Sequence, residues 1–196
     1  MKKLLILSLL ILSFFLLSLT TDDRQPRKVD AGIYTVIYSE DLEQPLEVWY
    51  NVQCPGGKAS RAGLDFYTND SIHTSSNEDY ENNIYDKGHM APAADFSCDR
   101  ATIQKTFSYL NCALQDQYLN RGAWRLLEIH EREIALKTKV SVHIILKFDE
   151  KSIKLPTGAT VPSGFTKEIK YGEVTEVYYF TNEKPKTSSY KDYIVK

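Results

Sequence analysis

A short segment in the middle of the chain gathers side chains that could hydrolyse a phosphate ester. Residues 86–96 read Asp-Lys-Gly-His-Met-Ala-Pro-Ala-Ala-Asp-Phe and contain one of only four histidines in the chain. Gly88 and Pro92 exclude a long helix here, so His89 is expected on a constrained turn. An imidazole with an ordinary pKa of about 6.5 is largely neutral at pH 7 and can accept a proton from water. The segment therefore predicts a general base.

A second group of polar side chains follows on an expected helix. Asn120 and Glu128 are eight residues apart, which is about 12 Å of rise if both are helical. Both could address one site through a metal ion and its waters. Mg²⁺ keeps most of its waters and accepts oxygen ligands, and it can act as a Lewis acid on a phosphate. Two alternatives remain open: Asn120 as a helix N-cap, and Glu128 with Arg132 as a surface ion pair.

Together these segments resemble the DNA/RNA non-specific endonucleases of the ββα-metal-finger superfamily, whose hallmark reads Asp-Arg-Gly-His. The resemblance runs over about residues 61–182. Besides 86–96, it rests on Leu-Asn-Arg-Gly-Ala-Trp at 119–124 with Glu128 in frame, and more weakly on 161–172 with the later Asn182. The fold class that the resemblance implies is α+β, with a ββα-metal core on a mainly antiparallel sheet and flanking helices.

The resemblance also implies roles for single residues. His89 matches the general base, Asn120 matches the side chain that binds the catalytic Mg²⁺ directly, and Glu128 matches the acid that holds metal-bound waters. Mn²⁺ can take the place of Mg²⁺ in this reading. Four further residues match phosphate-contacting or positioning residues of the family: Arg61, Lys87, Asn111 and Arg132. The implied activity is hydrolysis of DNA and/or RNA through the phosphate backbone, without sequence specificity, to short products with 5′ phosphates.

Two positions depart from the family pattern. Lys87 stands where the hallmark has Arg, which keeps the charge but loses the planar two-point contact with phosphate. Leu114 stands where the family commonly has Pro, and we interpret it as a local loop change. A rival hypothesis is a catalytically weak relative that binds nucleic acid or a partner protein, and the intact His89, Asn120 and Glu128 argue against it. A second rival is a phosphodiesterase of the same core that acts on another ester.

Length and composition fit one domain. The chain has 196 residues, of which 42% are hydrophobic and 26% are charged, so wholesale disorder, collagen and a coiled coil are excluded. Lys and Arg number 24 against 26 Asp and Glu, which gives a net charge of −2. No basic excess points to a nucleic-acid partner, so the protein would have to bind phosphates through a local site or a metal ion. Whether the chain forms a homodimer stays open.

The N-terminal residues are expected to lie outside this domain. Two lysines precede an apolar run from Leu4 to Leu19, which is typical of a secretory signal peptide. We expect a signal peptide over 1–20, a linker over 21–30 and the nuclease domain over 31–196. The alternative is a retained membrane anchor, although the run is slightly shorter than the ~20 residues that span a bilayer. The predicted location is secreted or periplasmic, with no stable membrane partner after cleavage.

Export would permit a disulfide. Cys54, Cys98 and Cys112 are the three cysteines of the chain, so one pair and one free thiol are expected. The sequence does not choose the pair; Cys98–Cys112, which would close a short loop, is favoured.

The elements that must position the site are mostly strands. Alternating apolar residues predict one hairpin over 32–39 and 46–52, a strand over 140–148, a second hairpin over 165–171 and 173–180, and a short strand over 190–195. Loops are expected over 53–63 and 69–83, and helical structure over 99–109 and 119–137. The longer helix presents one apolar face, made of Ala123, Leu126, Leu127, His130 and Ile134.

Overall fold

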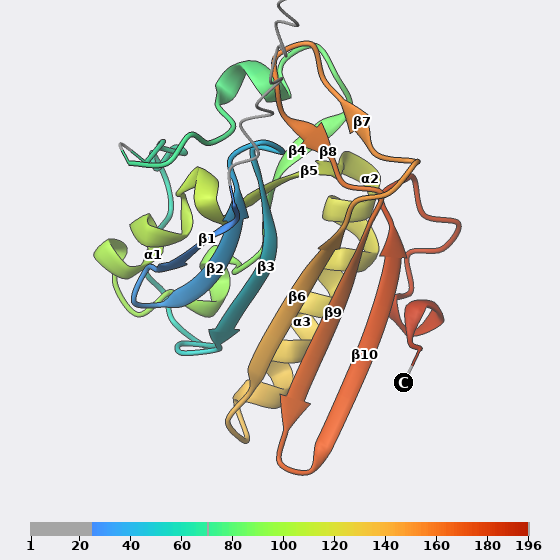
Figure 1. Ribbon diagram of the computed structural model, residues 1–196. Coiled ribbons are helices and arrows are strands. Elements are labelled where there is room, and N and C mark those ends of the chain that lie inside the picture. Colours follow the sequence, from blue (N-terminus) through green and yellow to red (C-terminus); the bar gives the residue numbers. More distant parts are fainter. Residues whose placement is uncertain (1–24, 70, 196) are drawn as a thin grey trace, which may run out of the picture.

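A six-stranded antiparallel sheet forms the centre of the molecule (Figure 1). The computed structural model describes residues 25–69 and 71–195, so the expected signal peptide lies outside the described residues. The strand order across the sheet is β1-β2-β3-β6-β9-β10. These strands are β1 (Arg27–Asp30), β2 (Tyr34–Ser39), β3 (Gln44–Asn51), β6 (Ser141–Lys147), β9 (Gly164–Tyr171) and β10 (Val174–Thr181).

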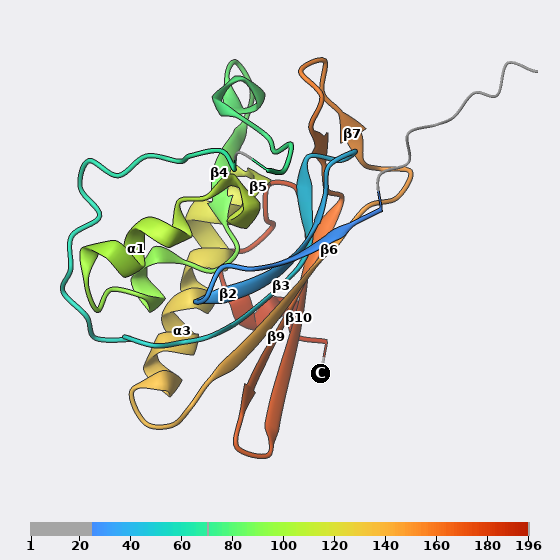
Figure 2. The ribbon, with the colours of Figure 1, turned by 60° about the vertical axis from the view of Figure 1, so that its left-hand side comes forward.

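The helices and two small strand pairs complete the fold. Helices α1 and α3 lie on the same side of the sheet, and the pair β4–β5 lies beyond the upper end of α3 (Figure 2). The strand pairs are β4 (Tyr85–His89) with β5 (Cys112–Asp116), and β7 (Ile153–Lys154) with β8 (Thr160–Val161). The helices are α1 (Arg100–Thr106), α2 (Gln117–Leu119), a π-helical turn (Asn120–Trp124) and α3 (Arg125–Ala135). Four 3₁₀ turns cover Asn77–Tyr80, Ala93–Asp95, Tyr109–Asn111 and Tyr190–Tyr193.

The core lies between the sheet and α3. Alternate strand residues face the helix, and Val36, Val48 and Ile144 form one fully buried row across β2, β3 and β6. Burial of such a side chain contributes about 1.5–3 kcal/mol. Lys167 continues this row on β9, so a lysine occupies a position that the strand pattern reserves for an apolar residue.

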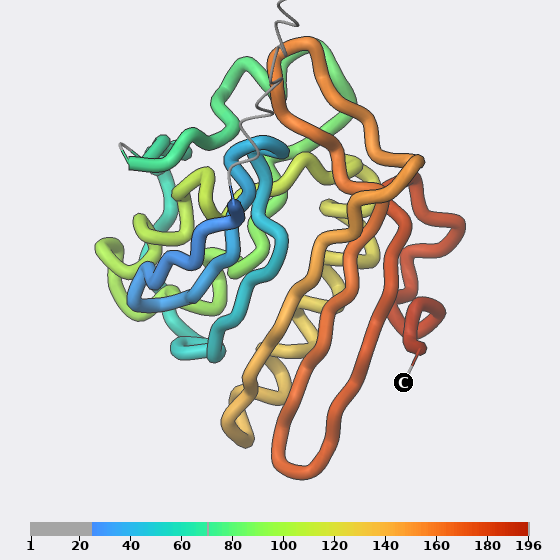
Figure 3. The backbone as a smooth tube through the Cα atoms, viewed as in Figure 1, coloured from blue at the N-terminus to red at the C-terminus, as the bar shows by residue number. Residues whose placement is uncertain are grey.

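The α+β class, the antiparallel sheet and both predicted hairpins are confirmed. Three segments differ from the expectation. Arg27–Asp30, assigned to the linker from its charge, form the edge strand β1 because their backbone pairs with β2. The C-terminal residues were predicted as a strand but form a 3₁₀ turn that runs back along β10 (Figure 3), with a single bridge between Ile194 and Tyr178. The pair β4–β5 was not expected from the local residue pattern, although the resemblance implied a ββα core.

The long helical segment begins earlier than predicted and is interrupted by a kink. Asp116, not Asn120, is its N-cap, because Asp116 Oδ1 accepts hydrogen bonds from the backbone of the first turn. Gly122 has φ −104° and ψ −114°, so the chain kinks between α2 and α3. Ala123 and Leu127 of the predicted face are fully buried, whereas the rest of that face is partly exposed. No helix in the described part of the chain is long and apolar enough to span a membrane.

The disulfide joins Cys54 to Cys98, and the favoured pair Cys98–Cys112 is wrong. Cys112 starts β5 and is fully buried, with its Sγ 3.2 Å from Tyr80 Oη. Burial raises the pKa of the Cys112 thiol to about 12. Sequence distance favoured the shorter loop, but pairing of β4 with β5 directs Cys112 away from Cys98.

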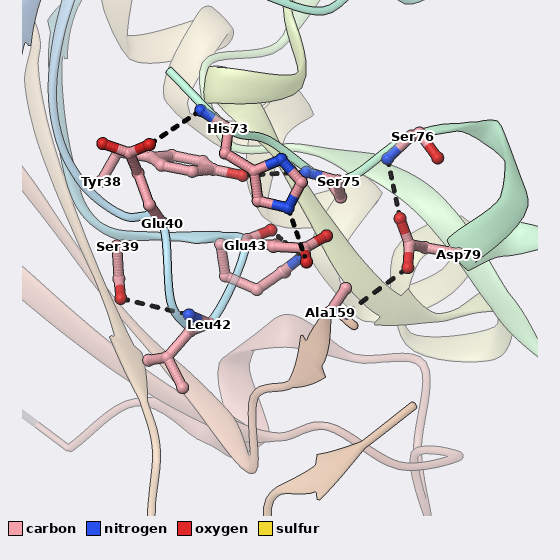
Figure 4. Close-up of polar contacts among 11 residues, drawn as sticks. Tyr38, Ser39, Glu40, Leu42, Glu43, His73, Ser75, Ser76, Asp79 and Ala159 are labelled. Atoms are coloured by element: carbon pink, nitrogen blue, oxygen red, sulfur yellow. Dashed lines mark hydrogen bonds and ion pairs between the residues drawn. The ribbon is translucent and has the colours of Figure 1, made fainter. Parts of the chain in front are cut away.

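The loop before β4 is held by polar contacts and is partly buried (Figure 4). Asp79 is almost fully buried and accepts hydrogen bonds from Ser76 N at 2.7 Å and from Ala159 N at 3.4 Å. His73 Nε2 lies 3.0 Å from Glu43 Oε1, in the turn between β2 and β3. These contacts fix the loop against two other segments and so place Asn77, which reaches the site described next.

Candidate active site

The strand β4 carries the predicted general base at its end. His89 pairs with Cys112 across β4–β5, and Met90 N donates to Asn111 O at 2.9 Å. A Cβ atom at Gly88 would lie 2.5 Å from Gln115 Oε1 and 3.2 Å from Ala113 O. Only glycine allows β5 to approach this closely, which explains its place in the motif.

Two phenylalanines enclose the His89 ring. Its centroid lies 4.7 Å from Phe66 and 4.8 Å from Phe107. Nε2 is buried and has no hydrogen-bond partner among the described residues. This burial, followed by the positive charge of Arg61, lowers the pKa of His89 to about 3. The imidazole is therefore neutral at pH 7 and its proton-accepting form predominates.

A cleft of about 360 Å³ lies against α3. It brings together Arg61, Glu128 and Arg132, three of the residues expected in the site, over a floor of small side chains. Burial raises the pKa of Glu128 to about 7, opposed by the charge of Lys167. The cleft therefore combines guanidinium groups with a carboxyl group that can exchange a proton near neutral pH. The guanidinium groups can bind phosphate.

Arg132 does not form the surface ion pair with Glu128 that was left open. Its Nη1 donates to Asp95 Oδ1 at 2.9 Å, and Asp95 is fully buried. Burial, together with the negative charge of Glu131, raises the pKa of Asp95. The pair therefore fixes the end of segment 86–96 to α3.

A buried ion pair lies behind the cleft. Lys167 Nζ is 2.7 Å from Glu131 Oε2, and both side chains are fully buried. Tyr50 Oη donates to Glu131 Oε1 at 2.9 Å, and Lys167 Nζ lies 4.8 Å from the Trp124 ring centroid. Glu128 lies one helical turn before Glu131 on α3, and the charges of Lys167 and Glu131 both act on its carboxyl group.

Asn120 begins the π-helical turn and is oriented by the first residue of the motif. Its Nδ2 donates to Asp86 Oδ2 at 2.9 Å. Arg121 donates to the same carboxylate from Nε at 2.8 Å and from Nη2 at 2.6 Å. Because Nδ2 is committed to Asp86, the amide oxygen is the atom of Asn120 that remains for a cation.

This donor set fits Mg²⁺. Asn120 offers a neutral amide oxygen, and Glu128 offers a carboxylate eight residues later in α3. Such a set suits an ion that binds few protein oxygens and keeps most of its waters. Among the described residues, no three His, Cys, Asp or Glu side chains cluster closely enough to hold a metal. Asn120 is the candidate direct ligand, and Glu128 is the candidate acceptor for metal-bound waters.

Four predicted site residues do not line the cleft: His89, Asn120, Asn111 and Lys87. Asn111 is fully buried, and its amide bonds to Ala91 N and O at 2.8 Å and to Thr106 O at 2.9 Å. It therefore fixes the turn after His89. Lys87 contacts Asn77 Oδ1 and lies 3.6 Å from Asp65 Oδ1, above the rings of Phe66 and Tyr109.

Sequence reasoning missed several residues of the site. Arg125 lines the cleft, and its Nε donates to Arg121 O at 3.1 Å. Its spacing of three residues from Glu128 was a signal that could have found it. Asp86, the first residue of the motif, was not predicted to have a role, although it binds the Asn120 amide. Leu114 N donates to Gln44 Oε1 at 3.0 Å, a bond that the Pro common in the family could not make.

Comparisons with known proteins agree with this architecture. A family model described as DNA/RNA non-specific endonuclease matches residues 19–196. The chain is 33% identical over 91 residues to "Endonuclease G, mitochondrial" of Bos taurus, covering 45% of this chain and 30% of that protein. It is 34% identical over 84 residues to "Nuclease EXOG, mitochondrial" of Danio rerio, covering 41% of this chain and 24% of that protein. The matched segments thus span less than a third of these relatives.

A solved structure of the EndoG/EndoGI complex shows the same fold over most of the chain. The TM-score is 0.74 at 25% sequence identity, and the match covers 86% of this chain and 80% of that one. Because the structural match extends far beyond the segments aligned by sequence, the sheet and α3 are shared as well as the motif.

Proposed function

The chain belongs to the DNA/RNA non-specific endonuclease family, and from that premise we propose that it hydrolyses phosphodiester bonds of DNA and/or RNA with His89 as general base and a divalent cation on Asn120. Mg²⁺ is the proposed ion, and Mn²⁺ is expected to replace it. The observation that carries the proposal is the neutral, unpartnered Nε2 of His89 within the electrostatic influence of Arg61, which lines the cationic cleft.

His89 would take the proton from the attacking water at an imidazole nitrogen. Its pKa of about 3 without substrate reflects burial and the positive charge of Arg61. A phosphate in the cleft would offset that charge and raise the pKa, so the imidazole becomes a better base when substrate is bound.

The arginines of the cleft would bind the substrate backbone. Arg61 and Arg132 line it from the 53–69 segment and from α3, and Arg125 adds a third guanidinium. Contacts of this kind hold phosphates and do not read bases, which supports cleavage without sequence specificity.

The cation would supply Lewis-acid stabilisation of charge on the phosphate when bound. Asn120 is held by Asp86 so that its amide oxygen can serve as a ligand, while Glu128 can accept hydrogen bonds from water. A neutral ligand leaves the charge of the cation undiminished. This local charge compensates for a chain with a net charge of −2.

Digestion of plasmid DNA and total RNA by the purified protein tests the proposal. Degradation should occur with Mg²⁺ or Mn²⁺, stop with EDTA, and fall by at least about 100-fold in His89→Ala, as expected for loss of a general base. The matched control is His143→Ala, because His143 lies on β6 and pairs with Glu47. A folded wild-type protein that binds DNA but cuts neither substrate from pH 6 to 9 would indicate a binding module instead.

We also propose that the protein acts outside the cytoplasm. The apolar run that starts at Leu4 is typical of export, and the Cys54–Cys98 disulfide suits an oxidising compartment. Fractionation of expressing cells, with non-reducing electrophoresis of each fraction, should place the oxidised protein outside the cytoplasm; a reduced, cytoplasmic protein would contradict this.

A further inference from the structure

An exposed aromatic side chain lies two residues before the proposed metal ligand. Tyr118 is in α2, two residues from Asn120, and 53% of its surface is exposed. Lys184 Nζ lies 4.8 Å from the centroid of its ring. An exposed tyrosine and a lysine at the edge of a catalytic site are chemically suited to a nucleotide, since the ring can stack on a base and the ammonium group can pair with a phosphate.

The two residues come from distant segments, and the fold holds those segments together. Asn182, two residues before Lys184, donates from Nδ2 to Leu114 O at 2.8 Å and to Pro162 O at 2.9 Å, and its Oδ1 accepts from Asp116 N at 2.8 Å. Asp116 in turn caps the backbone of Tyr118. The placement of Lys184 near Tyr118 therefore rests on several backbone contacts as well as on the pair itself.

Contacts connect this pair to the cleft. Arg121 follows Tyr118 by three residues, is exposed, and shares the Asp86 carboxylate with Asn120. Arg125 bonds to the backbone of Arg121 and lines the cleft. Tyr118 is also two residues before Asn120, the proposed metal ligand. A strand whose phosphate lies beside Asn120 would therefore place a neighbouring nucleotide near Tyr118.

We propose that Tyr118 and Lys184 form a nucleotide-binding subsite that holds an unpaired base and its phosphate beside the scissile bond, and so favours single-stranded substrate. The subsite rests on the proposed nuclease function. Stacking on Tyr118 needs a base whose face is free, and bases inside a duplex are already stacked on both faces. The same contacts would be made with single-stranded DNA or RNA.

Binding in the absence of metal tests the subsite independently of cleavage. Fluorescence anisotropy in EDTA would compare a labelled single-stranded 12-mer with the corresponding duplex. Tyr118→Ala should raise the Kd for the single strand by about tenfold, with a change of less than about twofold for the duplex, whereas Tyr118→Phe should retain binding. Lys184→Gln should weaken binding and reduce the slope of log K against log salt by about 0.7.

Controls separate recognition from stability. Lys170→Gln removes an exposed lysine from the strand β9 and should change neither affinity. Equal losses of binding to single strand and duplex in Tyr118→Ala, or wild-type affinities in both Tyr118→Ala and Lys184→Gln, would overturn the subsite and leave the pair as a structural contact. A lowered Tm without a change in the ratio of the two Kd values would do the same.

Cleavage distinguishes failure of the subsite from failure of the nuclease proposal. The ratio of kcat/KM for the 12-mer to kcat/KM for a p-nitrophenyl ester of thymidine 5′-phosphate should fall about tenfold in Tyr118→Ala. An unchanged ratio in an active enzyme would contradict the subsite alone. An inactive wild-type protein would contradict the nuclease proposal, while the anisotropy measurements would still decide the subsite.

Discussion

Asp86 Oδ2 accepts a hydrogen bond from Asn120 Nδ2 at 2.9 Å, which joins the first residue of the motif to the start of the long helix. The contact connects β4, which ends in His89, with the turn that carries the proposed metal ligand. The proposed general base and the proposed metal ligand are therefore fixed relative to each other through one carboxylate. Partners of this kind, which orient a metal ligand, commonly affect metal affinity.

Replacement of Asp86 should weaken metal binding more than it weakens the fold. Asp86→Ala leaves the Asn120 amide without its acceptor, so the Mg²⁺ concentration for half-maximal activity should rise about 10- to 100-fold. A Mg²⁺ titration of plasmid cleavage measures this. Arg121→Gln is the matched control, because it removes the other partner of Asp86 and keeps the bond to Asn120. Equal Mg²⁺ requirements in Asp86→Ala and wild type would contradict the prediction.

Phe66 should control the protonation of His89, the proposed general base. Burial is the main cause of the low pKa of His89, and Phe66 forms one wall of that environment. Phe66→Ala should admit water and raise the pKa from about 3 toward the ordinary 6.5. NMR titration of the imidazole measures the shift, with His143 as an internal control.

The same pKa has a consequence for stability. Between about pH 6.5 and pH 3 the unfolded chain binds a proton at His89 that the folded chain does not, so this group makes the protein less stable as pH falls through that range. The slope should be shallower in Phe66→Ala. Urea unfolding of both proteins at pH 5 and pH 8 tests this, and parallel pH dependence would be evidence against it.

The large sheet could be predicted from the sequence because each of its hairpins has a local signal in the residue pattern. Residues 32–39 and 46–52 alternate and are separated by a short polar turn, and Gly172 marks the turn of the second hairpin. The pair β4–β5 carries no such signal. Its strands are five residues each, one contains Gly88, and they meet only because β5 accepts the close approach of that glycine.

The sequence anticipated that some of the candidate residues would lie close together, but it gave no signal for the contacts that depend on tertiary packing. Arg61, Glu128 and Arg132 lie together as the motif implied. A helical pattern predicts that Glu131 is exposed to solvent. Its burial could not be predicted, because the lysine that neutralises it lies on a strand more than thirty residues later. The enclosure of His89 by Phe66 and Phe107 likewise depends on contacts between separate segments.

The disulfide should contribute to stability without contributing to the chemistry. It connects residues 44 apart and fixes the 53–63 segment to the end of the motif. Cys54→Ser combined with Cys98→Ser should lower the free energy of unfolding by about 2–5 kcal/mol. Thermal unfolding of the double variant beside Cys112→Ala measures this, since Cys112 is the free thiol. If reduction of the wild type leaves Tm unchanged, the prediction fails.

Removing one partner of the buried pair Glu131–Lys167 should destabilise the protein strongly, whereas removing both charges should destabilise it much less. Lys167→Met leaves a carboxylate with no cation in a fully buried position, which should destabilise the protein by about 3–5 kcal/mol. Adding Glu131→Gln removes the uncompensated charge and keeps an acceptor for Tyr50, so the double variant should recover much of the loss. Urea unfolding of both single variants and the double variant forms a complete cycle.

Activity of the same variants tells whether the pair serves the cleft. Glu128 lies one turn from Glu131 and is influenced by the charge of Lys167, which lowers its pKa against the effect of burial. If the pair only supports the fold, the double variant should cleave DNA like the wild type at a temperature where both are folded. If it also positions Glu128, cleavage should remain at least about tenfold reduced although stability has recovered. We expect the second outcome, because loss of Lys167 also removes the charge that stabilises ionised Glu128.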